Sequence, residues 1–186
     1  QIGVGRTSIR EALRQLEAEG LVTTVPHRGP EVSSITADEA RQLYEVRALL
    51  ESFAGQSFAE HGTDDDIREL GDAVERFAAA AEGGNRSQLI EAKTRFYAVL
   101  MNGAGNMFVR QMLTLLHNRI TLLRLTSMTQ PGRLADSVSE IREIYDAIRQ
   151  RDAARANAAC KRHIQTAAEI ALAVLRSNES RQPAKP

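Results

Sequence analysis

The chain has 186 residues and a formal net charge of zero, because 24 lysines and arginines balance 24 aspartates and glutamates. Its 42% apolar and 26% charged residues are typical of a globular fold and exclude a disordered or fibrous chain, and the length suits one medium domain with a small one beside it. The single cysteine, Cys160, excludes an internal disulfide, and no apolar run approaches the ~20 residues that cross a bilayer, so we expect a cytoplasmic protein without a membrane partner.

The first predicted element is a short helix near the start of the chain. Four apolar residues recur along it at helical spacing, Ile9, Ala12, Leu13 and Leu16. We therefore expect one face of this helix to be buried, and Gly20 stands where a C-terminal cap belongs. The β-prone runs LVTTVP and PEVSS follow on either side of His-Arg-Gly, which predicts a two-stranded wing.

Everything after about residue 34 has a helical pattern. Thr36 and Glu39 have the spacing of a capping box, and Thr63 ahead of an acidic turn marks a second helix start. Glycine and proline breaks then delimit four further helices, at about 87–103, 106–128, 133–150 and 153–178. We therefore predict a mainly α chain, in three parts: a partial winged helix-turn-helix domain at 1–35, an antiparallel bundle of about six helices at 36–178, and a flexible tail at 179–186.

Arginines line one edge of the first predicted helix. Arg6, Arg10 and Arg14 are four residues apart, so they share an edge that the apolar face leaves free. With the N–H groups at the start of the helix and the hydroxyls of Thr7 and Ser8, this edge could bind phosphates and contact base edges. The spacing alone fits equally well with a solvated face on which Arg14 pairs with a nearby glutamate.

The run GVGRTSIREALRQLEAEGLVTTVPHRGPEV, residues 3–32, resembles the recognition helix and wing of the GntR family of bacterial transcription regulators. Gly5 and Ser8 stand where that family usually has Ser and Pro. The winged domain of the family begins some tens of residues earlier, so we expect the sequence to start inside it. The resemblance implies that a set of six residues contacts double-stranded operator DNA: Arg6, Thr7, Ser8, Arg10, Arg28 and Gly29.

Residues 36–178 resemble the effector-binding FCD domain of the FadR-type subgroup of that family. The markers are YEVRALLE, TRFYAVLMNGAGN and GRLADSVSEIREIYDAIRQRDAARANAACKRHI. Many members hold a metal ion among four side chains, and the resemblance places those positions at Lys93, Tyr97, Ile141 and His163. A lysine repels a divalent ion and an isoleucine cannot coordinate one, so we expect neither a metal nor another cofactor.

Two possibilities for the lost metal site remain open. In the first, the Lys93 ammonium, the Tyr97 hydroxyl and the Arg47 guanidinium bind a small carboxylate or acyl metabolite directly, at a site that Ile141 and His163 complete. In the second, Ile141 and Tyr97 fill the cavity, Lys93 reaches the surface, and the protein has no effector. Cys160, one turn from His163, is expected to be a core residue.

The sequence as a whole predicts a homodimeric transcription regulator that binds operator DNA through two winged domains and responds to a small effector. An enzyme is the first alternative, but the sequence has no nucleophile elbow, no glycine-rich phosphate loop and no HExxH motif. The second alternative is an effector-independent regulator or an interaction module with a filled pocket.

Overall fold

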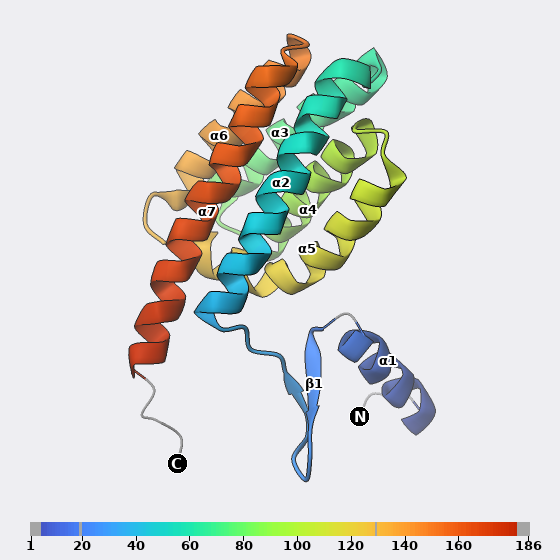
Figure 1. Cartoon of the computed structure of the whole chain (residues 1–186), viewed down its shortest axis with the longest axis vertical. Helices are drawn as coiled ribbons and strands as arrows, with labels where there is room; N and C mark the ends of the chain where they lie inside the picture. The colour runs from blue at the N-terminus through green and yellow to red at the C-terminus, as the bar shows by residue number, and fades with distance from the viewer. Residues whose placement is uncertain (1–4, 19, 129, 182–186) are drawn as a thin grey trace.

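The chain folds into a small winged part followed by a bundle of helices (Figure 1). The computed structural model describes residues 5–18, 20–128 and 130–181. Within them the bundle has six helices: α2 (Ala37–His61), α3 (Asp64–Gly83), α4 (Arg86–Gly103), α5 (Met107–Met128), α6 (Arg133–Arg149) and α7 (Ala153–Arg181). The predicted mainly α fold with about six bundle helices is confirmed. None of the described helices is both long and apolar enough to span a bilayer.

The winged part consists of α1 (Arg6–Ala18) and a hairpin of β1 (Val22–Val25) and β2 (Gly29–Val32). The strands are antiparallel, with Val25 opposite Gly29. Gly20 follows α1 with a left-handed φ of 73°, and its N–H and that of the next residue bond back to the carbonyls of Glu17 and Leu16. This is the Schellman arrangement that glycine favours after a helix. The predicted helix and two-stranded wing are confirmed.

The apolar face of α1 is less buried than its sequence predicts. Ile9 is 51% exposed, and Leu13 and Leu16 are only half-buried. Among the described residues α1 packs mainly on β1, a strand of four residues that cannot cover a helical face of 13 residues. The prediction of a buried face is therefore wrong for this structure, because the pattern identifies a face that can be buried but not the element that covers it.

Side chains from both ends of the bundle form hydrogen bonds with the segment that connects the wing to α2. Thr36 Oγ1 accepts from the Glu39 N–H at 3.2 Å while the Glu39 carboxylate accepts from the Thr36 N–H at 2.9 Å, which is the predicted capping box. Glu179, near the end of α7, accepts from the Ala37 N–H at 2.9 Å. The predicted flexible tail at 179–186 is therefore wrong for 179–181, because the first turn of α2 holds this carboxylate. Residues 182–186 lie outside the described part.

Two apolar clusters hold the bundle together. The larger one surrounds the fully buried rings of Phe58, Phe77 and Phe96, and the smaller one surrounds Tyr44, where α2, α5 and α7 meet. The guanidinium of Arg47 lies between the two, 5.6 Å from the ring centre of Tyr44 and 5.1 Å from that of a tyrosine of the larger cluster. A charged side chain thus lies in the middle of the core. Because arginines are rarely buried, Arg47 indicates a candidate functional site.

Candidate functional site

Helix α1 presents its polar edge to solvent. The exposed residues on it are Thr7, Ser8, Arg10 and Arg14. Among the described residues neither arginine forms an ion pair, and the Glu17 carboxylate instead accepts a hydrogen bond from the Thr24 N–H at 3.2 Å. The alternative in which Arg14 pairs with a neighbouring glutamate is therefore wrong, and the guanidinium donors of this edge face solvent. The side chain of Arg6 lies outside the described part.

The tip of the wing carries the other two predicted DNA contacts. Arg28 is exposed, and its N–H bonds to the Val25 carbonyl at 3.1 Å across the turn. Gly29 has a φ of 89°, a left-handed conformation in which a side chain would be strained. The helix edge and the wing tip are thus two separate places for a DNA backbone or groove to lie, and their contact with DNA stays a prediction.

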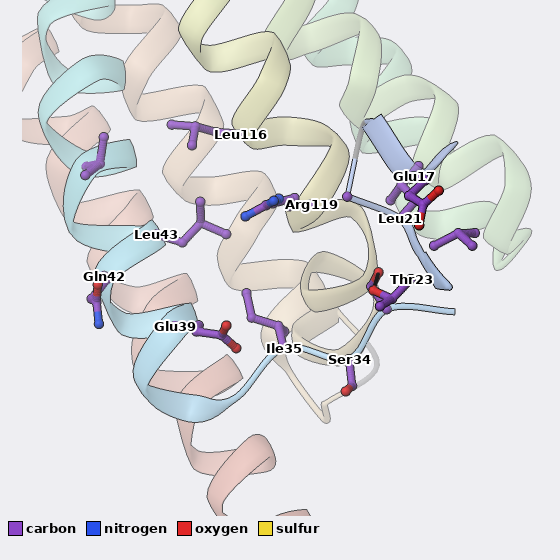
Figure 2. A pocket seen from close by; sticks show the side chains of 14 residues that line it. Glu17, Leu21, Thr23, Ser34, Ile35, Glu39, Gln42, Leu43, Leu116 and Arg119 are labelled. Atoms are coloured by element: carbon purple, nitrogen blue, oxygen red, sulfur yellow. Dashed lines mark hydrogen bonds between the residues drawn. The ribbon is translucent and has the colours of Figure 1, made fainter. Parts of the chain in front are cut away.

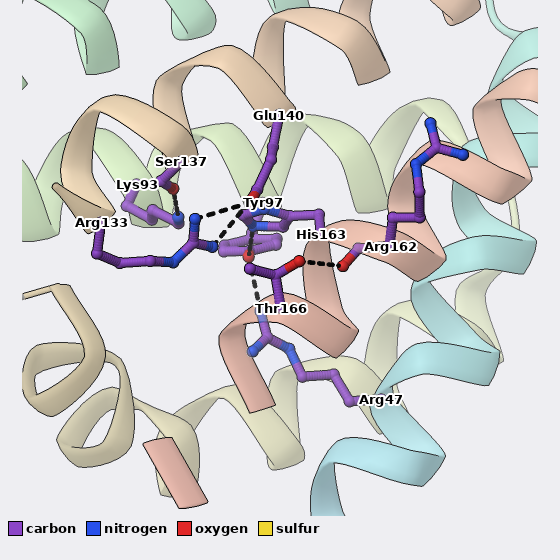
Figure 3. Close-up of polar contacts among 9 residues, drawn as sticks. All are labelled: Arg47, Lys93, Tyr97, Arg133, Ser137, Glu140, Arg162, His163 and Thr166. Atoms are coloured by element: carbon purple, nitrogen blue, oxygen red, sulfur yellow. Dashed lines mark hydrogen bonds and ion pairs between the residues drawn. The ribbon is translucent and has the colours of Figure 1, made fainter. Parts of the chain in front are cut away.

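The interior of the bundle contains a group of charged and polar side chains, which we call the polar cluster (Figure 3). Its members are Arg47 and Glu51 of α2, Lys93 and Tyr97 of α4, Arg133, Ser137 and Glu140 of α6, and His163 of α7. All except the half-buried Glu140 have exposures of at most 3%. Four of the five predicted effector residues therefore meet here, and the fifth, Ile141, is fully buried on α6.

One chain of hydrogen bonds runs through the polar cluster. Arg47 Nη2 donates to the Tyr97 hydroxyl at 2.6 Å, this hydroxyl lies 3.0 Å from His163 Nε2, and His163 Nδ1 lies 2.5 Å from the Glu140 carboxylate. Arg47 also pairs with Glu51 one turn along α2. Because a carboxylate only accepts, His163 carries its proton on Nδ1, and the Tyr97 hydroxyl donates to Nε2. Both imidazole nitrogens are therefore engaged.

The surroundings of His163 keep it neutral. Burial lowers the pKa of His163 to about 4, the ammonium of Lys93 acts in the same direction, and the bond to Glu140 opposes both. Burial would raise the pKa of Glu140, but its bonds to His163 and Arg133 outweigh burial and hold that pKa below its usual range. Arg133 makes two bonds of 2.8 Å to this carboxylate, a bidentate pair.

Lys93 points into the bundle. Its Nζ donates to Ser137 Oγ at 2.6 Å and lies 4.9 Å from the ring centre of Phe77 and 6.0 Å from that of Tyr97. The residue is 3% exposed. The possibility that Lys93 reaches the surface is therefore wrong, because one turn of helix places it on the same inward face as Tyr97, and neighbouring helices supply the Ser137 hydroxyl and the Phe77 ring.

Four members of the polar cluster were not predicted, namely Glu51, Arg133, Ser137 and Glu140. Three of these follow one another on α6 at intervals of four and three residues, on the face that also buries Ile141. That spacing is a detectable signal. It was missed because charged residues at helical spacing usually mark a solvated face, and only the packing of α6 against α3 and α7 shows that this one is turned inward.

The polar cluster is tightly packed. The residues around it enclose a cavity of about 10 Å³, about the space that one water molecule needs. Ser127 and Met128, at the end of α5, and Arg133, at the start of α6, are among the residues that line it. A carboxylate can therefore enter only if these helix ends or the side chains on them move.

A larger cavity, of about 560 Å³, lies where the wing meets the bundle (Figure 2). Its lining includes Leu21 after α1, Ile35 at the joint, and Leu116 and Arg119 of α5. The guanidinium of Arg119 lies so close to Gly20 that a Cβ added there would be 2.5 Å from its Nε. Helix α5 is thus in contact with the winged part as well as with the polar cluster.

The side chains of the polar cluster do not fit a transition metal. Among the four positions that the family resemblance assigns to metal ligands, Ile141 has no donor atom, Lys93 is cationic, and both nitrogens of His163 are engaged. Within the described residues no three His, Cys, Asp or Glu side chains come together as a metal site. Cys160 is buried, and burial raises the pKa of its thiol, as expected for an inert core cysteine.

The chain thus joins a winged element to a helical bundle that has a polar site in its interior. Residues 42–166 match the FCD domain, and residues 1–32 match the bacterial regulatory proteins of the gntR family. The chain belongs to the GntR family of bacterial regulatory proteins, and its helical part is an FCD domain.

Relatives and solved structures agree with this family. The probable D-xylose utilization operon transcriptional repressor of Paenarthrobacter nicotinovorans is 28% identical over 165 residues, 88% of this chain and 72% of that protein. The structure of Escherichia coli McbR/YncC has the same fold, with a TM-score of 0.75 at 20% identity over 92% of this chain and 85% of that one. The FCD domain of TM0439, solved metal-free and with Zn²⁺, gives TM-scores of 0.64 and 0.61 at 18% identity, over 78% of this chain and 99% of that one. The two family matches and the Paenarthrobacter relative support DNA-binding transcription regulation, and the solved structures show the same fold.

Proposed function

We propose that this chain is an operator-binding regulator whose affinity for DNA is set by a small carboxylate that binds at the polar cluster. The observation that supports this is the burial of three cationic side chains, Arg47, Lys93 and Arg133, each at most 3% exposed. Among the side chains that the structure describes, the cluster contains two carboxylates, Glu51 and Glu140, and these three cations. Buried charge is costly unless it is compensated, so an anionic ligand would stabilise this arrangement through charge-assisted hydrogen bonds.

The ligand would bind at the Lys93 ammonium. A carboxylate accepts a stronger hydrogen bond from an ammonium than the neutral Ser137 hydroxyl does, so it would replace the 2.6 Å bond between these two residues. Space for it would come from movement of Met128 at the end of α5, because the cavity of about 10 Å³ is too small. Since Arg119 of the same helix touches the winged part, such a movement would reach the DNA-binding edge.

An effector-independent regulator is the second candidate function. The small cavity favours it, since only about 10 Å³ is left beside the fully buried Tyr97, and Ile141 is fully buried as well. On this view the polar cluster serves only to fix how α2, α4, α6 and α7 pack, a role that buried ionic groups have in some proteins.

Thermal melting and operator binding with a panel of small mono- and dicarboxylates distinguish the two functions. We expect at least one acid to raise the melting temperature and to change the operator Kd of the whole regulator. Lys93→Met should abolish both effects, whereas Lys161→Met, which removes an exposed lysine of α7, should leave them unchanged. If Lys93→Met responds like the parent, or no acid has any effect, capture by Lys93 is refuted and the effector-independent function stands.

We also propose that two copies associate through α2 and α5. Large apolar side chains are exposed at helical spacing on these two helices, which pack together: Val46, Leu49 and Phe53, then Met107, Phe108, Met112 and Leu115. At about 100 Å² each they amount to roughly 700 Å², which exceeds the apolar patches of most monomers and approaches one side of a standard interface. A second copy matches this apolar face, because a two-fold axis brings it against itself.

Light scattering tests the association. The double variant Leu49→Lys/Leu115→Lys should be monomeric at micromolar concentration, because each copy would bring buried like charges to the interface. Thr94→Lys, at an exposed position of α4, should remain a dimer. A dimeric double variant would show that the copies associate elsewhere.

A further inference from the structure

A solved structure of the same fold is that of a Zn²⁺-bound FCD domain, and the family resemblance places the metal-ligand positions of such domains at Lys93, Tyr97, Ile141 and His163 of this chain. We propose that this chain has replaced the metal ion with two groups of its own: the Tyr97 hydroxyl proton, which satisfies His163 Nε2, and the Lys93 ammonium, which supplies the positive charge. The FCD domain of this chain is then independent of metal. This inference goes beyond the proposed function, since it holds whether or not a carboxylate binds.

Both imidazole nitrogens of His163 take part in hydrogen bonds that bear on metal binding. A metal-binding imidazole gives one nitrogen to the ion and donates the other N–H to a carboxylate or carbonyl. His163 keeps the second half of that pattern, because its Nδ1 lies 2.5 Å from the Glu140 carboxylate. On the other side Nε2, the nitrogen left to bind an ion, is 3.0 Å from the Tyr97 hydroxyl. His163 thus has the orienting bond of a metal-binding histidine. At Nε2, however, a hydroxyl proton accepts the lone pair in place of a metal ion.

Arg47 strengthens the substitution. Its Nη2 donates to the Tyr97 oxygen at 2.6 Å, and a charged donor on that oxygen makes the hydroxyl a better donor to His163. Glu51 in turn fixes the guanidinium from one turn along α2. The bond to Nε2 is therefore held in place by an ion pair that is itself buried, and an ion competing for this nitrogen would have to break the whole chain of bonds.

Lys93 and Ile141 make the site unfavourable for a cation, the first by its charge and the second by its hydrocarbon side chain. The Lys93 ammonium is held by Ser137 at 2.6 Å and lies beside the Phe77 ring, inside the space that the cluster encloses. A divalent cation placed there would be repelled by this fixed charge, with little water to screen it. Ile141 is fully buried and presents only carbon atoms. Lys93 and Ile141 therefore oppose a bound cation, and the Tyr97 hydroxyl occupies the His163 lone pair that the cation would need.

Metal analysis of the purified chain tests the inference. We expect metal content far below one ion per chain after incubation with Zn²⁺ or Ni²⁺, and the same melting temperature with either ion and with a chelator. About one bound ion per chain, lost in His163→Gln, would overturn the proposal. This assay involves neither DNA nor carboxylate, so its outcome is separate from that of the proposed function.

A reversed substitution adds a gain of function. Lys93→Asp, Tyr97→His and Ile141→His together would give a carboxylate and three imidazoles, a donor set suited to Zn²⁺ or Ni²⁺. We expect the triple variant to bind about one ion per chain and to melt at a higher temperature with it. The same variant with His163→Gln added should bind far more weakly. A folded triple variant that binds no ion would overturn the assignment of these four positions.

The protonation state of His163 provides a readout on the parent chain itself. Imidazole ¹⁵N shifts of the parent chain should show a protonated Nδ1 and a hydrogen-bond-accepting Nε2 at neutral pH. In Tyr97→Phe the Nε2 shift should move toward that of an unbonded nitrogen. A proton on Nε2 of the parent would contradict the role assigned to Tyr97.

Discussion

Tyr97→Phe removes one oxygen atom from the polar cluster and leaves the ring in place. That oxygen accepts from Arg47 and donates to His163, so the variant leaves a buried charged donor and a buried acceptor without this partner. A hydrogen bond to a charged group contributes about 1.5–3 kcal/mol and a neutral one about 0.5–1.5 kcal/mol. We therefore expect Tyr97→Phe to lower the free energy of unfolding by about 3 kcal/mol, or the melting temperature by roughly 10 °C for a chain of this length.

Urea unfolding followed by circular dichroism measures this difference, with Tyr145→Phe as the matched control. Tyr145 is a half-buried tyrosine of α6 whose hydroxyl has no hydrogen-bond partner among the described residues. Its variant should stay within about 0.5 kcal/mol of the parent. If Tyr97→Phe is no less stable than Tyr145→Phe, the hydroxyl does not bridge the two residues, and the chain of bonds through the cluster is refuted.

Three further predictions follow from local structure. Because burial lowers the folded-state pKa of His163 from 6.5 to about 4, the unfolded chain takes up the proton first; the stability that this residue contributes is complete above pH 6.5 and is lost as the pH falls to about 4. Urea unfolding across this window should show a weaker pH dependence in His163→Gln, and an unchanged one in a variant of the exposed His61. Arg10→Ala should weaken operator binding by about 1–3 kcal/mol in fluorescence anisotropy, and equal affinity would remove α1 from the interface. Gly20→Ala should lower the free energy of unfolding more than Gly84→Ala does. Both glycines have left-handed φ values, but only the Cβ added at Gly20 would meet a side chain, that of Arg119 in α5. Equal losses would show that this contact is unimportant.

The elements that local chemistry determines were predictable from the sequence. The capping box at Thr36 and Glu39 gave the start of α2, because both hydrogen bonds lie within one turn. The wing followed from two β-prone runs around a short turn. By contrast, the exposure of Ile9 depends on what packs against α1, and a helical period contains no information about a partner.

The polar cluster was predictable only in part. The sequence identified Lys93 and Tyr97 as inward-facing, but the same helical phase is compatible with a lysine that curls out to solvent. Its actual direction depends on Ser137, which is 44 residues away along the chain and in contact only through the fold. The volume left in the cluster depends on the rotamers of side chains from five helices, and a linear pattern does not specify these.

The bond between Glu179 and the first turn of α2 has a mechanical consequence. This hydrogen bond joins the last helix of the bundle, α7, to the first, α2, at the point where the wing is attached. The segment that leads to the wing is therefore held by two helices and not by α2 alone. Arg47, in the polar cluster, is ten residues beyond Ala37, which is ~15 Å along α2. A rotation of α2 by about 5° around that buried point would carry the mount through ~1 Å, and α7 would have to follow. A rotation of this kind would carry a change at the polar cluster to the wing.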